Sequence, residues 1–151
     1  MNARDIVLDP PYQRGVVWSD AMQMQYLDAF FRGIYAPPIV LAAYKDGDEV
    51  KMRCIDGKQR LSSLRRFMDG LIYVKNAQTG DEYWYKDIGG PSADGSAKKL
   101  IPEKSRESFN KKLVVGIEYE NISDADEREI FKYTHIGMPL ASYTHTLDRY
   151  L

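Results

Sequence analysis

The hydrophobic positions of this chain change their spacing from segment to segment, and these changes predict its elements. After Ser19, apolar side chains recur every three to four residues, which is the period of an amphipathic helix. They are Met24, Leu27, Phe30 and Phe31. Ser19 is a preferred N-cap and Gly33 is a preferred helix end, so the pattern predicts a helix over residues 20–32.

Shorter apolar runs, bounded by proline, glycine and aspartate, predict strands. The expected strands are residues 6–8, 39–44, 50–55, 71–74, 83–85 and 112–119. Four of them form two hairpins around the turns at 45–48 and 76–80. The last run, KLVVGIEY, is apolar enough to be a buried strand, and the Gly- and Ser-rich residues 88–98 predict a loop.

Three further helices are expected. One begins near Lys58 and ends at the next Asp-Gly pair. Another begins at Ser123, which stands three residues before Asp126 as in a capping box, and ends at Gly137. A last helix is expected over residues 142–151, and whether it is complete stays open because the sequence stops directly after it.

The order of these elements indicates an α+β domain. Strands and helices alternate irregularly, with two hairpins between them, which favours a small mixed sheet with helices packed on it. A chain of 151 residues has the usual size of one domain. Hydrophobic residues make up 44% and charged residues 28%, which argues against disorder. We therefore expect residues 1–151 to form a single domain.

Charge and cysteine content exclude several classes of protein. Lys and Arg number 21 and Asp and Glu number 22, so any contact with nucleic acid must use a local patch rather than bulk charge. A lone cysteine, Cys54, rules out an internal disulfide and a thiolate zinc cluster. No apolar run is long enough for a signal peptide or a membrane span. We expect an intracellular protein, cytoplasmic or nuclear, with no membrane partner.

The segment CIDGKQRLSSL, residues 54–64, carries the clearest chemical pattern. It joins a strand to a helix start, where free backbone N–H groups and the helix dipole favour an anion, and Gly57 lets a phosphate approach closely. Four side chains here are typical of phosphate sites: Lys58, Arg60, Ser62 and Ser63. Asp56 is a candidate to hold a metal ion, orient Arg60 or position a water. A Walker A pattern is absent, and an Asp-Gly turn capping a solvated helix explains the segment equally well.

A second polar pair follows a rigid Pro-Pro bend in the segment PPYQRGVVW. Gln13 and Arg14 would present an amide and a guanidinium fork, and Tyr12 and Trp18 would offer surfaces for stacking. The alternative is that Trp18 packs in the core and Arg14 makes a structural ion pair.

Four segments occur in one order: PPYQRGVVW, GIYAPPIVL, CIDGKQRLSSLRRFMDG and IEYENISDADEREIFKYTHIGMPL. Together they resemble the N-terminal domain of GmrSD-type restriction enzymes, and their details are most similar to stand-alone fungal-type members. The resemblance spans the chain from Ile6 to about Leu140 and implies a fold similar to ParB and sulfiredoxin.

The resemblance also implies binding and hydrolysis of a nucleoside triphosphate through an Asp-Gly-Gln-Gln-Arg signature, whose middle position is Lys58 in this chain. It implies three catalytic residues, Asp56, Gln59 and Arg60. Together, the resemblance and the pattern at the helix start give the expected phosphate-binding residues: Gln13, Arg14, Gly57, Lys58, Ser62 and Ser63. Mg²⁺ or Mn²⁺ at Asp56 is the expected cofactor. The catalytic cysteine of sulfiredoxins has no counterpart in the turn, where Lys58 stands instead.

Three functions stay open. The first is a domain that binds, and as an enzyme hydrolyses, a nucleoside triphosphate. The second is a metal-dependent DNA-binding or nuclease domain that uses the same pocket on a phosphodiester. The third is a non-catalytic interaction module. The base, the metal, turnover and the oligomeric state are not defined by the sequence, and a dimer is compatible with it.

Overall fold

The computed structural model describes residues 6–8, 17–90, 95 and 97–136. In chain order the elements are β1 (Ile6–Val7), α1 (Asp20–Phe31), β2 (Ile39–Asp46), β3 (Glu49–Asp56), α2 (Lys58–Met68), β4 (Tyr73–Lys75), β5 (Glu82–Trp84), β6 (Lys99–Leu100), α3 (Glu103–Lys111), β7 (Gly116–Glu120) and α4 (Asp124–Ile136). This is the α+β class that the sequence predicted, and it is consistent with a ParB-like fold.

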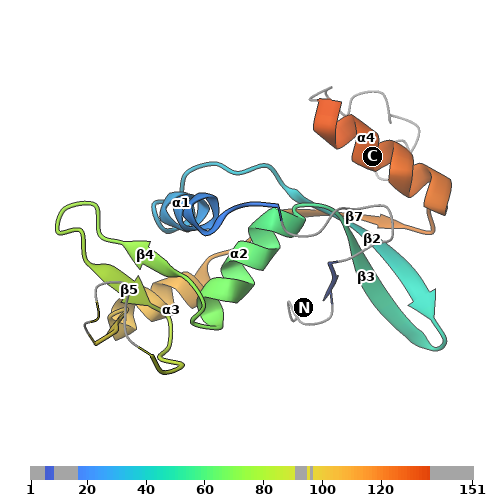
Figure 1. Ribbon diagram of the computed structural model, residues 1–151. Coiled ribbons are helices and arrows are strands. Elements are labelled where there is room, and N and C mark those ends of the chain that lie inside the picture. Colours follow the sequence, from blue (N-terminus) through green and yellow to red (C-terminus); the bar gives the residue numbers. More distant parts are fainter. Residues whose placement is uncertain (1–5, 9–16, 91–94, 96, 137–151) are drawn as a thin grey trace.

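The described strands form two small sheets where the sequence suggested one. The first has the order β1-β3-β2-β7, in which β2 and β3 are antiparallel and the outer strands β1 and β7 run parallel to their neighbours. The second has the order β4-β5-β6. Figure 1 shows the β2–β3 hairpin at one end of the molecule and the β4–β5 hairpin at the other, with α2 running between them.

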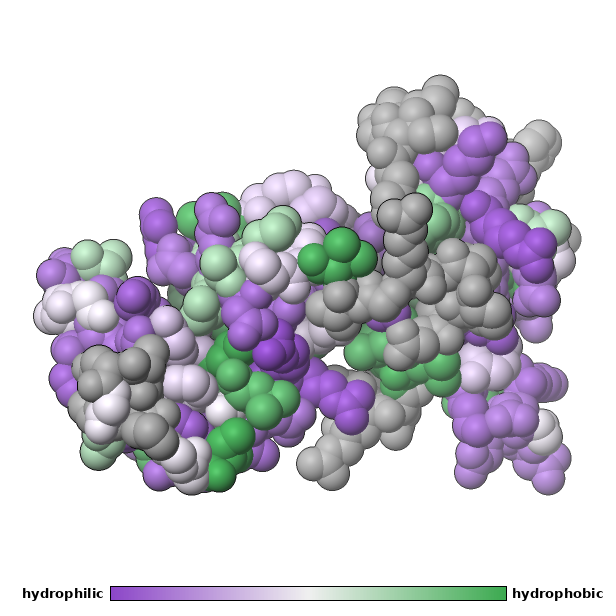
Figure 2. All heavy atoms as spheres, in the orientation of Figure 1, coloured by the Kyte–Doolittle hydropathy of each residue, from purple (hydrophilic) through white to green (hydrophobic). Residues whose placement is uncertain are grey.

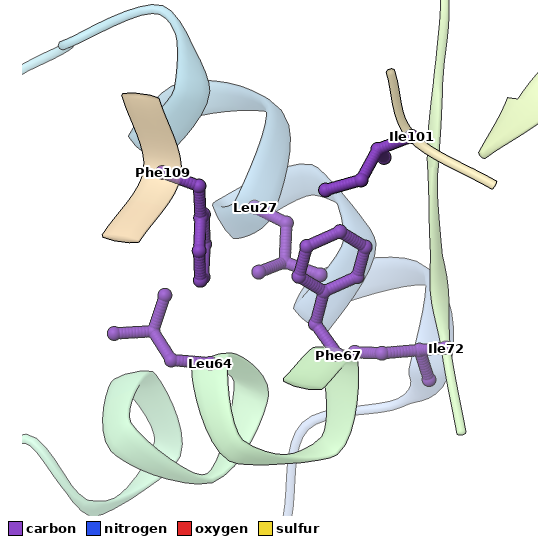
Figure 3. Close-up of a cluster of buried hydrophobic side chains, with 6 residues drawn as sticks. All are labelled: Leu27, Leu64, Phe67, Ile72, Ile101 and Phe109. Carbon is purple, nitrogen blue, oxygen red and sulfur yellow. The ribbon is translucent and has the colours of Figure 1, made fainter. Parts of the chain in front are cut away.

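Helices α1, α2 and α3 and the second sheet pack around a cluster of aromatic and aliphatic side chains. Six buried residues form this cluster (Figure 3): Leu27, Leu64, Phe67, Ile72, Ile101 and Phe109. The rings of Phe67 and Phe109 lie 5.3 Å apart at 68°, an edge-to-face geometry that aromatic pairs favour. This packing fixes α2 against α1.

The first sheet is covered on both faces next to the end of β3. On one face, Ile130 of α4 packs against Val40, Ala42 and Ile55. On the other, Leu61 of α2 packs with a cluster that includes Cys54. The turn between β3 and α2 therefore lies where the sheet, α2 and α4 meet.

An ion pair between Arg53 of β3 and Glu127 of α4 fixes α4 on the sheet. Glu127 is only 3% exposed, and its two oxygens lie 3.0 and 3.1 Å from Nη1 of Arg53. We expect Glu127→Gln to lower the free energy of unfolding by about 2 kcal/mol, because the guanidinium loses a buried charged partner. Chemical denaturation measures this. Glu129→Gln, on an exposed position of the same helix, is the control and is expected to change little. Equal effects would contradict this role.

In the later part of the chain, one expectation was wrong and two elements had not been expected. The predicted buried strand at 112–119 starts only at Gly116, and Leu113 and Val115 are 90% and 67% exposed. Helix α3 and strand β6 occupy residues that the sequence did not assign to elements. The predicted last helix, 142–151, and the helix end at Gly137 lie outside the described residues.

Candidate functional site

The turn between β3 and α2 is closely shaped around Gly57. This residue has φ +104°, a region that L side chains rarely adopt. A Cβ atom at this position would lie 2.3 Å from Cδ1 of Ile39 and 3.2 Å from Nη2 of Arg60. Position 57 therefore requires glycine both for its backbone conformation and for the space around it.

The first turn of α2 has the charge pattern of an anion site. Gly57 is the N-cap residue and offers no side-chain cap, and the first turn holds no acidic residue. It carries Lys58 and Arg60 instead, both of which are buried. Cations at a helix N-terminus oppose the helix dipole and so reduce helix stability. An anion placed there would be attracted by the cations and by the positive end of the dipole.

Arg60 is the best-defined cation at this turn. Its Nη2 donates to Oδ2 of Asp56 at 3.1 Å and to the carbonyl oxygen of Pro38 at 3.2 Å. The side chain is only 9% exposed, and its Nε is buried without a hydrogen-bond partner in the part of the chain that the structure describes. Burial raises the pKa of nearby Tyr26, and the Arg60 charge opposes that rise. A guanidinium is thus held in place with donor capacity left over.

Gln59 connects this turn to the segment that precedes α1. Its Oε1 accepts hydrogen bonds from the backbone N–H groups of Val17 at 3.0 Å and Trp18 at 3.1 Å. The Trp18 ring is half-buried and lies 5.9 Å from the Tyr26 ring. The IDGKQR segment, residues 55–60, therefore brings Trp18 to the same site.

These residues line a cleft of about 770 Å³. Residues 55–60 contribute its polar groups, and the remaining lining is largely apolar: Val17, Trp18, Tyr26, Tyr35, Ala36, Pro37 and Phe131. A cleft of this size, with few polar groups among aromatic ones, is typical of a small-molecule site. In the view of Figure 2, hydrophilic side chains dominate both ends of the molecule, and hydrophobic ones reach the surface between them.

The structure brings together Trp18, Asp56, Gly57, Lys58, Gln59 and Arg60 from the predicted set. Ser62 and Ser63 do not line the cleft, since both are buried and the Ser63 hydroxyl donates to the Gln59 carbonyl oxygen at 2.7 Å. Tyr12, Gln13 and Arg14 lie outside the described residues. Sequence reasoning missed Tyr26, Tyr35 and Phe131, which come from three separate elements or loops and share no local motif.

The carboxylate of Asp56 is the candidate metal ligand. Within the described ranges no three His, Cys, Asp or Glu side chains are grouped so as to hold a metal ion. Among the described residues that line the cleft, Asp56 is the single carboxylate, and its Oδ2 already pairs with Arg60. Mg²⁺ is commonly held by one or two carboxylates together with substrate phosphates. A metal ion would fit here when phosphate oxygens complete its ligands.

Cys54 is a core residue, as the sequence predicted. It is fully buried, and burial raises the pKa of its thiol to about 12. The reactive thiolate is therefore almost absent at pH 8. We expect a thiol reagent to leave Cys54 unmodified in the folded protein at pH 8 and to modify it fully in denaturant. Absorbance measures the labelling, and rapid labelling of the folded protein would contradict this expectation.

The family model described as the GmrSD restriction endonuclease, N-terminal domain, matches residues 1–144. The chain belongs to this family. The assignment that the four sequence segments suggested is thereby confirmed, while the similarity to fungal-type members stays a prediction. No curated protein and no solved structure matches this GmrSD-type domain. Among the helices in the described ranges, none is long and apolar enough to cross a membrane.

Proposed function

We propose that this GmrSD-type domain binds the phosphate groups of a single nucleotide at the start of α2. The observation that carries the proposal is Arg60, a nearly buried guanidinium in the cleft wall with an Nε that lacks a partner among the described residues. It stands beside a helix start with no side-chain cap and no acidic residue in its first turn. An arginine in this setting suits phosphate recognition because its fork presents several fixed donors.

The size of the cleft favours one nucleotide over a duplex. Its volume of about 770 Å³ falls within the range of small-molecule sites, roughly 300–1,000 Å³. A double helix, whose major groove alone is about 12 Å wide, is too large to be enclosed by such a cleft. The ligand is therefore a free nucleotide or a single nucleotide extruded from a strand.

Each predicted residue has a specific role in the proposal. Arg60 and Lys58 neutralise the phosphates, and the backbone at Gly57 approaches them. Asp56 would hold Mg²⁺ or Mn²⁺ together with phosphate oxygens. Gln13 and Arg14, which lie outside the described residues, are proposed to add further phosphate contacts. Ser62 and Ser63 stay outside the phosphate-binding set because they lie behind the helix start, away from the cleft lining.

Hydrolysis of a nucleoside triphosphate is the further step of the proposal. The metal ion would supply charge neutralisation on the phosphates when it is bound. As the alternative to holding the metal ion, Asp56 would orient the water. Gln59 would hold the wall of the cleft in place, and Arg60 would stabilise charge that develops on the transferred group. The domain would then be a nucleoside triphosphatase.

Calorimetric titration with ATP and with GTP, each with and without Mg²⁺, tests the binding step. We expect saturable binding of at least one of them, tighter with Mg²⁺ if Asp56 shares the ion with the phosphates. Release of inorganic phosphate from the bound nucleotide tests turnover. Absence of binding under all four conditions would overturn the proposal, and binding without phosphate release would leave a non-catalytic module.

A DNA-directed role is the second candidate, because the description of the matching family names a restriction endonuclease. The same site would then act on a phosphodiester with Mg²⁺ or Mn²⁺. Incubation with plasmid and either metal separates the two functions. Cleavage that is lost in an Asp56→Ala/Gln59→Ala double variant would support this role, and cleavage that survives the double variant would count against it.

A further inference from the structure

The backbone of Trp18 is held from both sides by glutamine side chains. Oε1 of Gln59 accepts its N–H at 3.1 Å, and Nε2 of Gln23 donates to its carbonyl oxygen at 2.9 Å. Gln59 comes from α2 and Gln23 from α1. Two elements that are distant in sequence therefore fix the position of one aromatic residue in the cleft wall.

Gln23 is itself held in place. It is 1% exposed, and its Oε1 accepts from Nη1 of Arg66 at 3.0 Å. The same Nη1 pairs with Oδ1 of Asp20 at 2.6 Å. With its amide nitrogen on Trp18 and its amide oxygen on Arg66, Gln23 has partners for both ends of its amide. A buried amide that lost these bonds would be costly, so the arrangement is well determined.

The held residue presents an aromatic surface to the cleft. The Trp18 ring packs at 58° against Tyr26, and both line the cleft that also contains Arg60. Aromatic side chains beside a cationic groove are the common means of binding a nucleobase without reading its identity, because every base has a flat face. Rigid placement lowers the entropy cost of such stacking.

We propose that Trp18 stacks on the planar ring of the nucleotide and that Gln59 and Gln23 are its positioning residues. This inference rests on the proposed function. It adds a contact for the ring of the nucleotide, which the phosphate contacts do not involve. It separates two groups of contacts. Phosphate binding depends on Arg60 and the start of α2, whereas binding of the ring depends on the hydrogen-bonded support of Trp18.

Two ligands separate these contributions, ATP and inorganic tripolyphosphate, which carries phosphates and no ring. In the Gln23→Leu variant we expect ATP affinity to fall about tenfold, a typical loss for a disturbed stacking contact, with tripolyphosphate affinity unchanged within about twofold. Gln23 does not line the cleft, so this loss would act through Trp18. Gln25→Leu, on an exposed position of the same helix, is the control and should change neither affinity.

Fluorescence gives an independent readout. The chain has two tryptophans, so Trp84→Phe leaves Trp18 as the single reporter. ATP is expected to quench Trp18 and tripolyphosphate is not. In the same background, Gln23→Leu is expected to make Trp18 more accessible to acrylamide.

If Gln23→Leu does not fold, Gln23→Glu serves instead, because a carboxylate still pairs with Arg66 and cannot donate to the Trp18 carbonyl oxygen. Equal losses for both ligands, no loss for either, or ATP binding without a change in Trp18 fluorescence would overturn the inference alone. If the unsubstituted protein bound neither ATP nor tripolyphosphate, the proposed function would be overturned, and this inference with it.

Discussion

Gly57→Ala is expected to lower the free energy of unfolding by about 3 kcal/mol and to abolish nucleotide binding. The backbone at φ +104° is one reason, because a non-glycine residue there costs on the order of 1–3 kcal/mol. The second is the 2.3 Å approach of the added Cβ to Cδ1 of Ile39, a buried side chain at the start of β2. To relieve the backbone strain or the contact with Ile39, the turn between β3 and α2 would have to shift, and the proposed site depends on this turn.

Two comparisons separate these causes in chemical denaturation. Gly47→Ala has a similar left-handed backbone, at φ +65°, but open space around the new Cβ, so it reports the backbone cost alone at about 1 kcal/mol. Ile39→Val removes Cδ1, and the Gly57→Ala/Ile39→Val pair should recover part of the steric cost. If Gly57→Ala cost no more than Gly47→Ala, the described packing of the turn would be wrong.

Arg60→Ala is expected to weaken nucleotide binding at least about 100-fold. The variant loses the guanidinium that is proposed to bind the phosphates and leaves Asp56 without its 3.1 Å partner, so that a carboxylate adds unpaired negative charge to the cleft. Arg60→Lys keeps the charge but not the fork, so an intermediate loss of about tenfold is expected. Calorimetry gives the affinities.

The control for this series is Arg65→Ala, which removes an exposed arginine from the same helix and should leave affinity nearly unchanged. Thermal melting shows whether each variant is folded. Asp56→Asn/Arg60→Ala removes the unpaired carboxylate, and a loss that persists in it reflects the missing guanidinium itself. Full affinity in the folded Arg60→Ala protein would exclude Arg60 from binding.

Local chemistry made several parts of this fold predictable. The end of β3, the glycine turn and the start of α2 all follow from short-range preferences and lie where the sequence placed them. The capping box is also confirmed, since the Ser123 hydroxyl and the Asp126 backbone N–H are 3.2 Å apart and Asp126 accepts from the Ser123 N–H at 3.0 Å. Such features need only neighbouring residues.

Other parts depend on contacts between distant segments. The run KLVVGIEY looks buried by composition. Among the strands that the structure describes, however, β7 is the outermost on its side of the sheet, and its flank at Leu113 is exposed. Helix α3 is mostly polar, and its Phe109 packs on α1 and α2. The local sequence pattern does not predict this contact.

The candidate site shows the same division. Its polar residues came from one motif, whereas the aromatic wall and the support of Trp18 by Gln23 depend on how α1 lies on α2. The pairing of Gln59 with the Trp18 backbone likewise joins residues 41 apart in sequence.

The central claim is that phosphates bind at the start of α2, and backbone amide NMR during titration with tripolyphosphate tests it most directly. We expect the largest shifts at the amides of Gly57, Lys58, Gln59 and Arg60, and we expect Arg60→Ala to remove them. If the largest shifts occurred elsewhere and residues 57–60 were unchanged, phosphate binding at the start of α2 would be excluded.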